Sequence, residues 1–304
     1  MGCKNSDIKL LTIGIPIYNN ESTLSRAIDS VLSQSGFDFI IILSDDGSSD
    51  NSWDICQKYA ALDHRITAIR QKTNLYYNNF KYVLDAAKTP YFCWLAGDDY
   101  FEDGFLKKAI ETLVRQEDAV AAIGECWFYE ESEFVELANG SYAIVHDDAG
   151  ERLEEYLSAS TDNSRMYGVF RTKSAQQSFP SRLFYTYDFV FSSLTLTYGK
   201  HVHLGMVAIH RDKTNIESYR KLVRKDAKNI LTRLFPLLPM TYYLMRHKQV
   251  NITWPIFKKL MMLNFNAHLN YCEYFHDSYY KFLIAIQNEY TRRIGWRFKQ
   301  KSRD

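Results

Sequence analysis

Leu95-Ala96-Gly97-Asp98-Asp99-Tyr100 is the stretch that decides the fold. It follows an apolar run over residues 91–94 that is typical of a buried strand, and it precedes a predicted helix over residues 102–115. Two adjacent carboxylates at the end of a buried strand repel each other and lose hydration unless a cation or hydrogen-bond donors stand beside them. A helix N-cap explains one aspartate but not both. The pair therefore predicts a site where a hard divalent cation links carboxylate to phosphate oxygens.

Strand and helix patterns alternate along the first 128 residues. Apolar runs rich in β-branched residues predict buried strands, and apolar residues at helical spacing predict amphipathic helices. Helices are predicted to end near residues 34, 62, 88 and 115. Alternation of this kind is typical of an α/β domain with a mostly parallel sheet and flanking crossover helices. The strands are predicted over residues 9–17, 39–43, 65–70, 91–96 and 119–128.

Polar residues follow three of these strands. Tyr18-Asn19 ends the first, Asp45-Asp46 ends the second, and Asp98-Asp99 ends the fourth. Ligands of parallel sheets bind beyond the carboxyl ends of the strands. Three polar strand ends therefore predict a ligand site at one edge of the sheet.

Beyond residue 128 the alternation is lost. Residues 130–150 are acidic and irregular, and Asn139-Gly140 predicts a hairpin there. Asp188 lies at the start of a further predicted helix, and His210 ends the last predicted strand. The elements predicted in this part are helices over 151–159 and 186–199 and strands over 167–171 and 202–210.

Charge divides the chain into two regions. The formal net charge is +1, but residues 216–304 hold 17 Lys and Arg against 6 Asp and Glu, which gives +11 there and −10 over residues 1–215. We therefore predict a domain over residues 1–215 and a basic, aromatic-rich helical extension over residues 216–304. Five scattered cysteines without a C-x-x-C pair indicate neither a disulfide framework nor a zinc site. With no signal peptide in view, they favour the cytoplasm.

The basic region has three open interpretations. In the first, the basic region neutralises the acidic region of the same molecule. In the second it forms a homo-oligomer, and in the third it lies on an anionic membrane. We favour the membrane surface, because the region combines Lys and Arg with Trp254, Trp296 and an apolar piece over residues 234–245. That piece is shorter than the roughly 20 residues that span a bilayer. Nucleic acid is not predicted as a partner, because no nucleic-acid-binding motif accompanies the basic and aromatic residues.

Four pieces of the first half resemble family 2 glycosyltransferases of the GT-A fold in their order and spacing. The resemblance covers residues 8–128 and extends to about residue 211. The pieces that carry it are Ile15-Pro16-Ile17-Tyr18-Asn19-Asn20-Glu21, Asp45-Asp46-Gly47-Ser48-Ser49-Asp50, Asn74, and Trp94-Leu95-Ala96-Gly97-Asp98-Asp99.

This resemblance implies a binding site for the nucleotide of a UDP-sugar. Pro16 and Tyr18 match the floor on which the nucleotide base stacks. Asp46 matches the acceptor for the base N3–H. Glu21 and Asn74 belong to the same donor-binding motifs.

The resemblance also assigns the reacting end of the site. Asp98 matches the ribose ligand, and Asp99 matches the carboxylate that holds Mn²⁺ or Mg²⁺ on the diphosphate. Asp188 matches the catalytic base, and His210 matches the C-terminal metal ligand of some GT-A enzymes. Inverting transfer needs such a base for the acceptor hydroxyl and a cation for the departing diphosphate.

Several of these residues have a second interpretation. In that interpretation Tyr18 packs in the core, Asp45 closes its turn, and Asp188 caps its helix. His210 is then a structural or surface histidine. These alternatives stay open from the sequence alone.

The chain departs from the family pattern in three places. Gly97 stands where the family often has an acidic residue, and Tyr76 stands where an Asn-x-Gly signature has glycine. The Gln-x-x-Arg-Trp motif of processive synthases is missing from the sequence, which favours transfer of a single sugar.

The resemblance implies an inverting glycosyltransferase that moves one sugar from a UDP-sugar to a glycan or lipid-linked acceptor. The expected setting is the assembly of a bacterial surface polysaccharide (a capsule, O-antigen or teichoic-acid-like polymer) in the cytoplasm or on the inner face of its membrane. The alternative is a nucleotide-sugar-binding or scaffolding protein of a glycan assembly complex that has lost catalysis.

Overall fold

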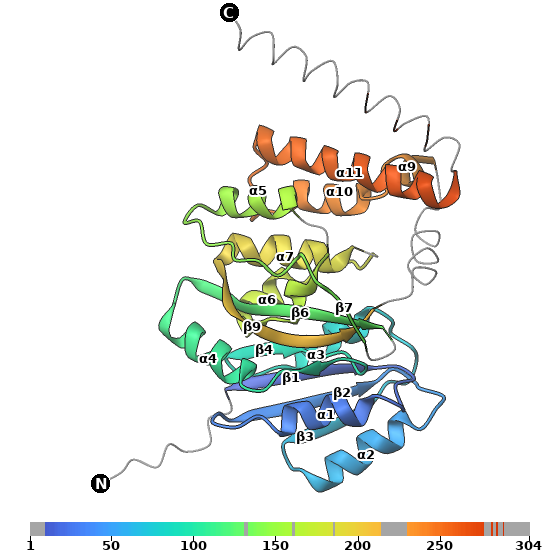
Figure 1. Ribbon diagram of the computed structural model, residues 1–304, viewed down its shortest axis with the longest axis vertical. Coiled ribbons are helices and arrows are strands. Elements are labelled where there is room, and N and C mark those ends of the chain that lie inside the picture. Colours follow the sequence, from blue (N-terminus) through green and yellow to red (C-terminus); the bar gives the residue numbers. More distant parts are fainter. Residues whose placement is uncertain are drawn as a thin grey trace, which may run out of the picture.

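Apolar runs and amphipathic helices build a single mixed sheet with helices on both faces (Figure 1). The computed structural model describes residues 10–130, 133–159, 162–184, 186–213 and 230–276, with the single positions 281, 284 and 288. Within these residues the strand order is β3-β2-β1-β4-β8-β6-β9-β5, and β7 pairs with β6.

The first half of the sheet is parallel, as the alternation predicted. The register places Ile17 beside Asp45 and Asp45 beside Arg70, so the carboxyl ends of these three strands are level. Every residue of the first strand is buried, as its predominantly apolar sequence requires. The strands of this half are β1 (Leu11–Ile17), β2 (Phe39–Asp45), β3 (Ile66–Arg70) and β4 (Tyr91–Trp94).

The second half of the sheet is mixed. Antiparallel β8 joins β4 to β6, and β6 runs parallel to β9. The short strand β5, which the sequence did not predict, adds to the edge of β9. The strands of this half are β5 (Tyr100–Phe101), β6 (Ala119–Glu130), β7 (Glu133–Leu137), β8 (Val169–Arg171) and β9 (Lys200–Asp212).

The hairpin of the irregular region is not where the sequence predicted it. Strands β6 and β7 form the antiparallel pair, so the chain reverses between Glu130 and Glu133. Gly140 instead donates its backbone N–H to Asp162 Oδ2 at 2.8 Å. The Asn139-Gly140 signal is overridden because this long-range bond holds the loop.

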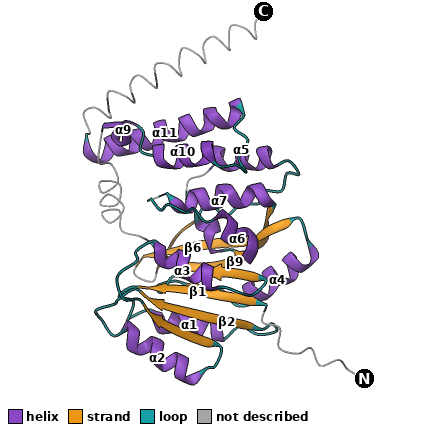
Figure 2. Cartoon of the chain, turned by 180° about the vertical axis from the view of Figure 1, so that it is seen from behind, coloured by secondary structure: helices purple, strands orange, loops and turns teal. Residues whose placement is uncertain are grey.

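Helices cover the two faces of the sheet with separate apolar clusters (Figures 1 and 2). On β4, Cys93 faces one cluster and Trp94 the other, as strand alternation requires. The helix predicted from residue 102 begins at Phe105, because Gly104 has a positive φ of 77°. One face carries α1 (Leu24–Leu32), α2 (Ser52–Leu62) and α4 (Phe105–Arg115), and the other carries α3 (Asn78–Ala86), α6 (Thr172–Ser178) and α7 (Tyr187–Tyr198).

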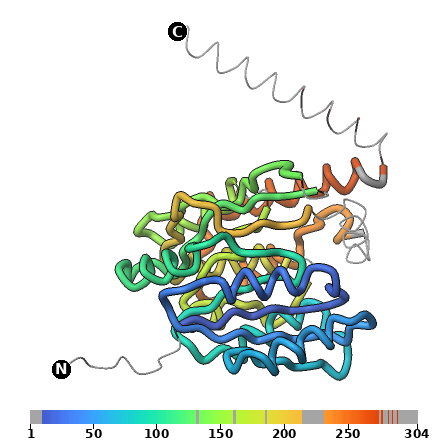
Figure 3. Tube along the Cα trace, turned by 60° about the horizontal axis from the view of Figure 1, so that its bottom comes forward, coloured from blue at the N-terminus to red at the C-terminus, as the bar shows by residue number. Residues whose placement is uncertain are grey.

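A third apolar cluster joins the C-terminal helices to the domain. Leu194 of α7 and Tyr156 of α5 share it with Leu244 and Leu260 of the last helices. Figure 3 shows these orange to red helices away from the blue first strands. No helix among the described residues is long and apolar enough to cross a membrane. The added helices are α5 (Ala149–Ala159), α9 (Ile230–Leu234), α10 (Leu238–Arg246) and α11 (Trp254–Phe275), and the predicted boundary at residues 215/216 lies outside the described residues.

A buried arginine and a buried histidine meet between the sheet and α5. Both Arg165 and His201 have no exposed surface, and Arg165 Nη1 lies 3.2 Å from His201 Nδ1. The guanidinium also lies over the rings of Tyr142 and Tyr156. Burial lowers the pKa of His201 well below its ordinary value, and the charges of Arg165 and Arg152 lower it further. A neutral His201 can therefore accept from Arg165.

We expect this histidine to make folding sensitive to acid. Below about pH 6.5 an unfolded histidine binds a proton that the buried one refuses, so the free energy of unfolding falls by about 1.4 kcal/mol per pH unit. His201→Gln keeps an acceptor for Arg165 but removes the histidine's contribution to the pH dependence of the free energy of unfolding. Urea unfolding between pH 7.5 and pH 5.5 should therefore give a shallower pH slope for His201→Gln than for wild type. Equal slopes for wild type and His201→Gln would contradict the buried neutral state.

Candidate active site

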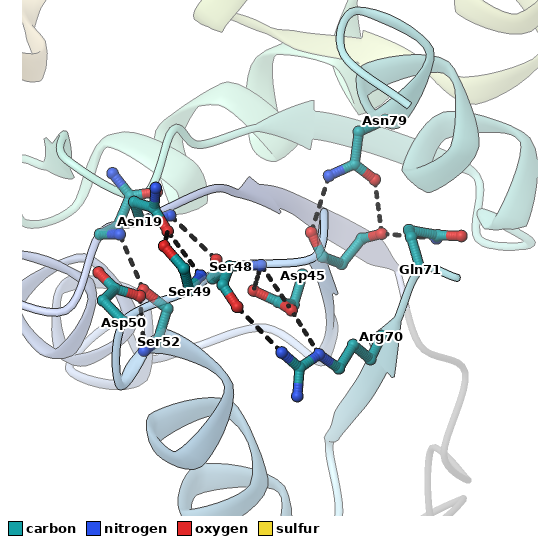
Figure 4. Close-up of polar contacts among 11 residues, drawn as sticks. Asn19, Asp45, Ser48, Ser49, Asp50, Ser52, Arg70, Gln71 and Asn79 are labelled. Atoms are coloured by element: carbon teal, nitrogen blue, oxygen red, sulfur yellow. Dashed lines mark hydrogen bonds and ion pairs between the residues drawn. The ribbon is translucent and has the colours of Figure 1, made fainter. Parts of the chain in front are cut away.

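The loops that follow β1 and β2 are joined into one rigid floor (Figure 4). Asn19, at a φ of 55°, donates its backbone N–H to Ser48 Oγ at 2.9 Å. Its side-chain Oδ1 accepts from the Ser49 backbone N–H at 2.9 Å. Asparagine tolerates this left-handed conformation better than most residues. The polar strand ends predicted from the sequence therefore lie together at the carboxyl edge of the sheet.

Asp45 closes the second loop from inside. Its carboxylate is fully buried and lies 3.3 Å from Arg70 Nε. The Ser48 backbone N–H points at both of its oxygens. Arg70 also donates to the Ser48 carbonyl at 2.9 Å. These contacts give Asp45 the turn-closing role that the sequence left open.

Asp46 and Asn74 hold the loop after β3 against the loop after β2. Asp46 Oδ1 accepts from the Leu75 N–H at 2.6 Å, and its Oδ2 accepts from the Tyr76 N–H at 2.9 Å. Asn74 Oδ1 also accepts from Tyr76, at 2.8 Å. Burial raises the pKa of Asp46, although these two backbone donors oppose the rise. Each carboxylate oxygen keeps a further lone pair for a base N–H.

Tyr76 explains one departure from the family pattern. It has a φ of 52° at the position where the family signature has glycine. A left-handed conformation costs a non-glycine residue roughly 1–2 kcal/mol. The side chain is 67% exposed beside the Asp46 turn. The loop therefore keeps the glycine-type backbone and adds an aromatic ring at its surface.

The residues after β1 have three different surroundings. Pro16 is buried within the strand, whereas the Tyr18 side chain is 53% exposed. That exposure excludes Tyr18 from the core and favours its role as a stacking surface. Glu21 Oε2 accepts from the backbone and side-chain amides of Asn51, at 3.0 and 2.9 Å. The Glu21 carboxylate thus fixes the start of α2, and its contact with the donor stays a prediction.

Asn20 explains the missing carboxylate at Gly97. A Cβ atom placed on Gly97 would lie 2.7 Å from Asn20 Oδ1. That oxygen accepts from the Tyr18 backbone N–H at 3.0 Å. A side chain at position 97 would therefore displace the amide that orients the Tyr18 loop.

The two aspartates after β4 lie in different surroundings. Asp99 is 1% exposed, and its Oδ2 accepts from Arg211 Nε at 2.9 Å. Burial raises the pKa of Asp99 to about 7, and the guanidinium of Arg211 opposes that rise. Asp98 is half-buried, and its carboxylate makes no hydrogen bond or ion pair within the part of the chain that the structure describes. Asp98 therefore offers the more accessible carboxylate.

His210 lies on the other face of β9 from Arg211, because neighbouring strand residues point to opposite faces. Its Nε2 lies 2.6 Å from Glu102 Oε2, and its Nδ1 lies 3.0 Å from Tyr129 Oη. The ring stacks on Tyr100 with centroids 4.5 Å apart. Both ring nitrogens thus have partners away from Asp99. The surroundings favour the structural interpretation, and metal binding by His210 stays a prediction.

Asp188 lies in the first turn of α7. Burial raises its pKa to about 6, opposed by the Phe189 backbone N–H, the Asn163 amide and the charge of Arg211. The buried Asn163 is itself fixed, because its Oδ1 accepts from Tyr156 Oη at 3.0 Å and from Ser192 Oγ at 2.7 Å. An aspartate with a pKa near 6 is ionised at neutral pH yet basic enough to take a proton.

Arg211 links the predicted catalytic and phosphate-binding residues. The charge of Arg211 opposes the rise in the pKa of both Asp99 and Asp188. The negative charge of Asp98 raises the pKa of Asp99. Arg211 donates to Tyr167 Oη at 3.2 Å, and its guanidinium lies 4.1 Å from the Tyr167 ring centre. The sequence did not single out Arg211, Tyr167 or Asn163. Only the position of Arg211 directly after His210 at a strand end pointed toward the site.

Comparison with known proteins decides the family. The model of "Glycosyl transferase family 2" matches residues 12–176, more than half of the chain. The chain belongs to this family. The match ends before Asp188 and Arg211, so it includes the predicted nucleotide floor and the Asp98-Asp99 pair but neither the candidate base nor the arginine.

Bacterial glycosyltransferases are among the relatives of this family 2 member. GlyA of Streptococcus pneumoniae is 28% identical over 45% of this chain and 20% of its own length. EpsJ of Bacillus subtilis, an uncharacterized glycosyltransferase, is 33% identical over 41% of this chain and 36% of its own length. GlyG of Streptococcus pneumoniae is 32% identical over 41% of this chain and 42% of its own length. The chain thus matches at most about two fifths of these proteins.

Solved structures share the fold of this family 2 member. S. aureus TarS residues 1–349 match 88% of this chain and 73% of that one, with a TM-score of 0.59 at 15% identity. The same protein in complex with UDP-GlcNAc matches 87% of this chain and 81% of that one, with a TM-score of 0.56. The predicted α/β GT-A architecture is confirmed.

Proposed function

We propose that this family 2 member is an inverting glycosyltransferase that moves one sugar from a UDP-sugar to an acceptor hydroxyl. The observation that carries the proposal is Arg211, which forms an ion pair with Asp99 at 2.9 Å and whose charge also favours the ionised form of Asp188. Asp99 follows the carboxyl end of β4, and α/β folds bind their ligands at the carboxyl ends of the strands. A carboxylate base, a second carboxylate and a cation are the groups that the transfer needs.

In this reaction Asp188 takes the proton of the acceptor hydroxyl. The acceptor oxygen forms a bond to the anomeric carbon of the sugar. The bond from that carbon to the diphosphate oxygen breaks, and its electron pair leaves with UDP. Arg211 contributes positive charge beside the site, and the Phe189 backbone N–H, which donates to Asp188 Oδ1 at 2.9 Å, helps to keep Asp188 ionised.

We propose uracil as the base that stacks on the floor. Tyr18 presents an exposed ring, and Asp46 retains lone pairs for the N3–H of uracil. Crystal structures of the fold relative TarS contain UDP and UDP-GlcNAc. Both the residues of the floor and the likeness in fold to TarS therefore support a UDP-sugar as the donor. The proposal covers the nucleotide and not the identity of the sugar.

A divalent cation fits this site only together with the donor. Among the described residues, no group of three or more His, Cys, Asp or Glu side chains is placed to hold a metal ion. Mg²⁺ and similar ions are, however, often held by one or two carboxylates together with substrate phosphates. Asp98 is the available carboxylate, whereas Asp99 is already paired with Arg211. We therefore propose Asp98 in place of Asp99 as the residue facing Mn²⁺ or Mg²⁺, which when bound would stabilise charge on the departing diphosphate.

The acceptor is proposed to be a glycan or lipid-linked glycan of a bacterial surface polysaccharide. The similar curated proteins include bacterial glycosyltransferases from Streptococcus pneumoniae and Bacillus subtilis. Transfer of the sugar to a lipid-linked acceptor would place the protein at the inner face of the cytoplasmic membrane.

Nucleotide binding gives the first test. We expect UDP to raise the thermal midpoint of the full chain, and Mn²⁺ to enlarge this shift, because ligands that bind only the folded state stabilise it by mass action. UDP release from a panel of UDP-sugars then reports turnover. Asp98→Ala should abolish the added effect of Mn²⁺ and keep the shift from UDP alone. If UDP does not shift the midpoint, the proposal that the donor is a UDP-sugar is overturned. UDP binding without turnover of any donor would favour the alternative of an inactive scaffolding protein.

A further inference from the structure

The C-terminal helices expose an unusual amount of apolar surface. Eight of the sixteen exposed large apolar side chains in the described part of the chain come from residues 230–276. Soluble surfaces carry single apolar residues, and grouped ones indicate an interaction site. The eight residues are Leu231, Leu234, Phe235, Tyr242, Met245, Trp254, Met262 and Phe265.

On α11 these side chains form a stripe. Trp254, Met262 and Phe265 are 65%, 58% and 45% exposed. They stand at positions i, i+8 and i+11, which brings them to one side of a helix with 3.6 residues per turn. The buried Ile256 and Leu260 lie on the opposite side, in the third apolar cluster. The stripe is therefore additional to the face that packs on the domain.

The neighbouring helix α10 repeats the pattern on a smaller scale. Tyr242, Met245 and Arg246 are exposed at i, i+3 and i+4, while Leu244 is buried. Its partner α11 is fixed to it, because Asn264 Nδ2 donates to Thr241 Oγ1 at 2.7 Å. Within the described residues, Figures 1 and 2 show the two helices at the opposite end of the molecule from β3 and α2.

Cations lie among these apolar side chains. Lys258 Nζ lies 5.4 Å from the centre of the Trp254 ring, within the stripe. The Arg246 guanidinium lies 5.3 Å from the Tyr242 ring. Over residues 230–276 the only acidic residue is Glu273, against five basic ones: Arg233, Arg246, Lys248, Lys258 and Lys259. This face combines apolar anchors with one sign of charge.

We propose that the outer face of α10 and α11 docks on an anionic phospholipid bilayer. Trp, Phe and Met reach the acyl boundary while Lys and Arg meet lipid phosphates, as in helices that lie in the membrane interface. Charge complementarity favours a bilayer over a second copy of the same face, which would bring like charges together. The inference does not rest on the proposed reaction, because docking needs neither donor nor acceptor.

Vesicle flotation of the full chain tests this face. We expect the protein to float with vesicles of phosphatidylcholine and phosphatidylglycerol, but not with phosphatidylcholine alone, and to float less at high salt. The variant Trp254→Ser/Met262→Ser/Phe265→Ser should bind at least about tenfold more weakly, since it removes the apolar anchors. Lys258→Gln/Arg246→Gln should weaken binding and its salt dependence together.

A matched control replaces exposed apolar residues elsewhere. Leu62 and Val114 are 75% and 60% exposed on α2 and α4, and Leu62→Ser/Val114→Ser should float like wild type. The thermal midpoint of each variant, with and without UDP, shows whether it is folded. Flotation of the folded triple variant equal to wild type would overturn the proposal. If neither the wild type nor any variant floats and the wild type is a dimer in size-exclusion chromatography, the face is assigned to a second copy of the chain. If none of them floats and the wild type is a monomer, the face is assigned to the chain's own residues.

Discussion

Asp188→Asn is expected to lower kcat/KM for sugar transfer by about 10²- to 10⁴-fold, the usual contribution of a general base. The amide cannot take the acceptor proton, but it keeps the size of the side chain at the start of α7. UDP binding, measured by thermal shift, should stay close to wild type because the nucleotide floor is built by other loops. Transfer is measured as UDP release at subsaturating donor.

The pH dependence of the wild type checks the same residue. Burial raises the pKa of Asp188 to about 6, so the ionised, active form is lost as pH falls below about 6. The rate should therefore fall about tenfold per pH unit below that point and level off above it. Asp148→Asn is a matched control, because Asp148 Oδ1 accepts from the Glu151 N–H at the start of α5, away from this edge of the sheet. A folded, UDP-binding Asp188→Asn protein with wild-type kcat/KM would place the base elsewhere.

The parallel half of the fold is predictable because its strands are buried on both faces. The run over residues 11–17 has one polar side chain, Thr12, whose hydroxyl is hydrogen-bonded to Thr89, and every residue of the run is buried. Burial of both faces leaves no polar alternation, so a strand of this kind has few competing interpretations. The mixed half has weaker local signals. Strand β5 has only two residues, and the Asn139-Gly140 signal gives way to the bond from Gly140 to Asp162.

The candidate site is predictable in its motif residues but not in their partners. Asp46 follows a recognisable strand, yet its contacts with Leu75 and Tyr76 depend on how the loop after β3 folds back. Arg211 lies 112 residues from Asp99 in the sequence. Strand alternation predicts that His210 and Arg211 point to opposite faces, but only the pairing of β9 with β5 and β6 determines which one meets Asp99.

This pairing changes how the Asp98-Asp99 motif is understood. The family resemblance assigns the ribose to Asp98 and the metal to Asp99. A buried carboxylate held by a guanidinium would have to give up that partner to bind a cation. The half-buried neighbour Asp98 has no such partner among the described residues and needs no such exchange. We therefore propose that the motif combines a buried aspartate held by Arg211 with an aspartate available to the donor.

Arg211→Met is expected to lower the free energy of unfolding by about 3–5 kcal/mol, because it leaves Asp99 buried without its cation. Urea unfolding measures this change. The double variant Asp99→Asn/Arg211→Met should recover most of the loss, since no uncompensated charge remains and methionine fills the space of the arginine stem. Lys81→Met is a control, because Lys81 pairs with Asp85 one turn along α3, with side chains 33% and 51% exposed, and should cost less than about 1 kcal/mol.

The same three variants separate the structural role of Arg211 from a role in transfer. If Arg211 acts only by holding Asp99, the double variant should regain turnover together with stability. If its charge also stabilises the departing diphosphate, the double variant should fold and bind UDP while kcat stays low, because an interaction made in the transition state is missing. A loss of less than about 1 kcal/mol in Arg211→Met would contradict the buried pair itself, since such a value is typical of exposed ion pairs.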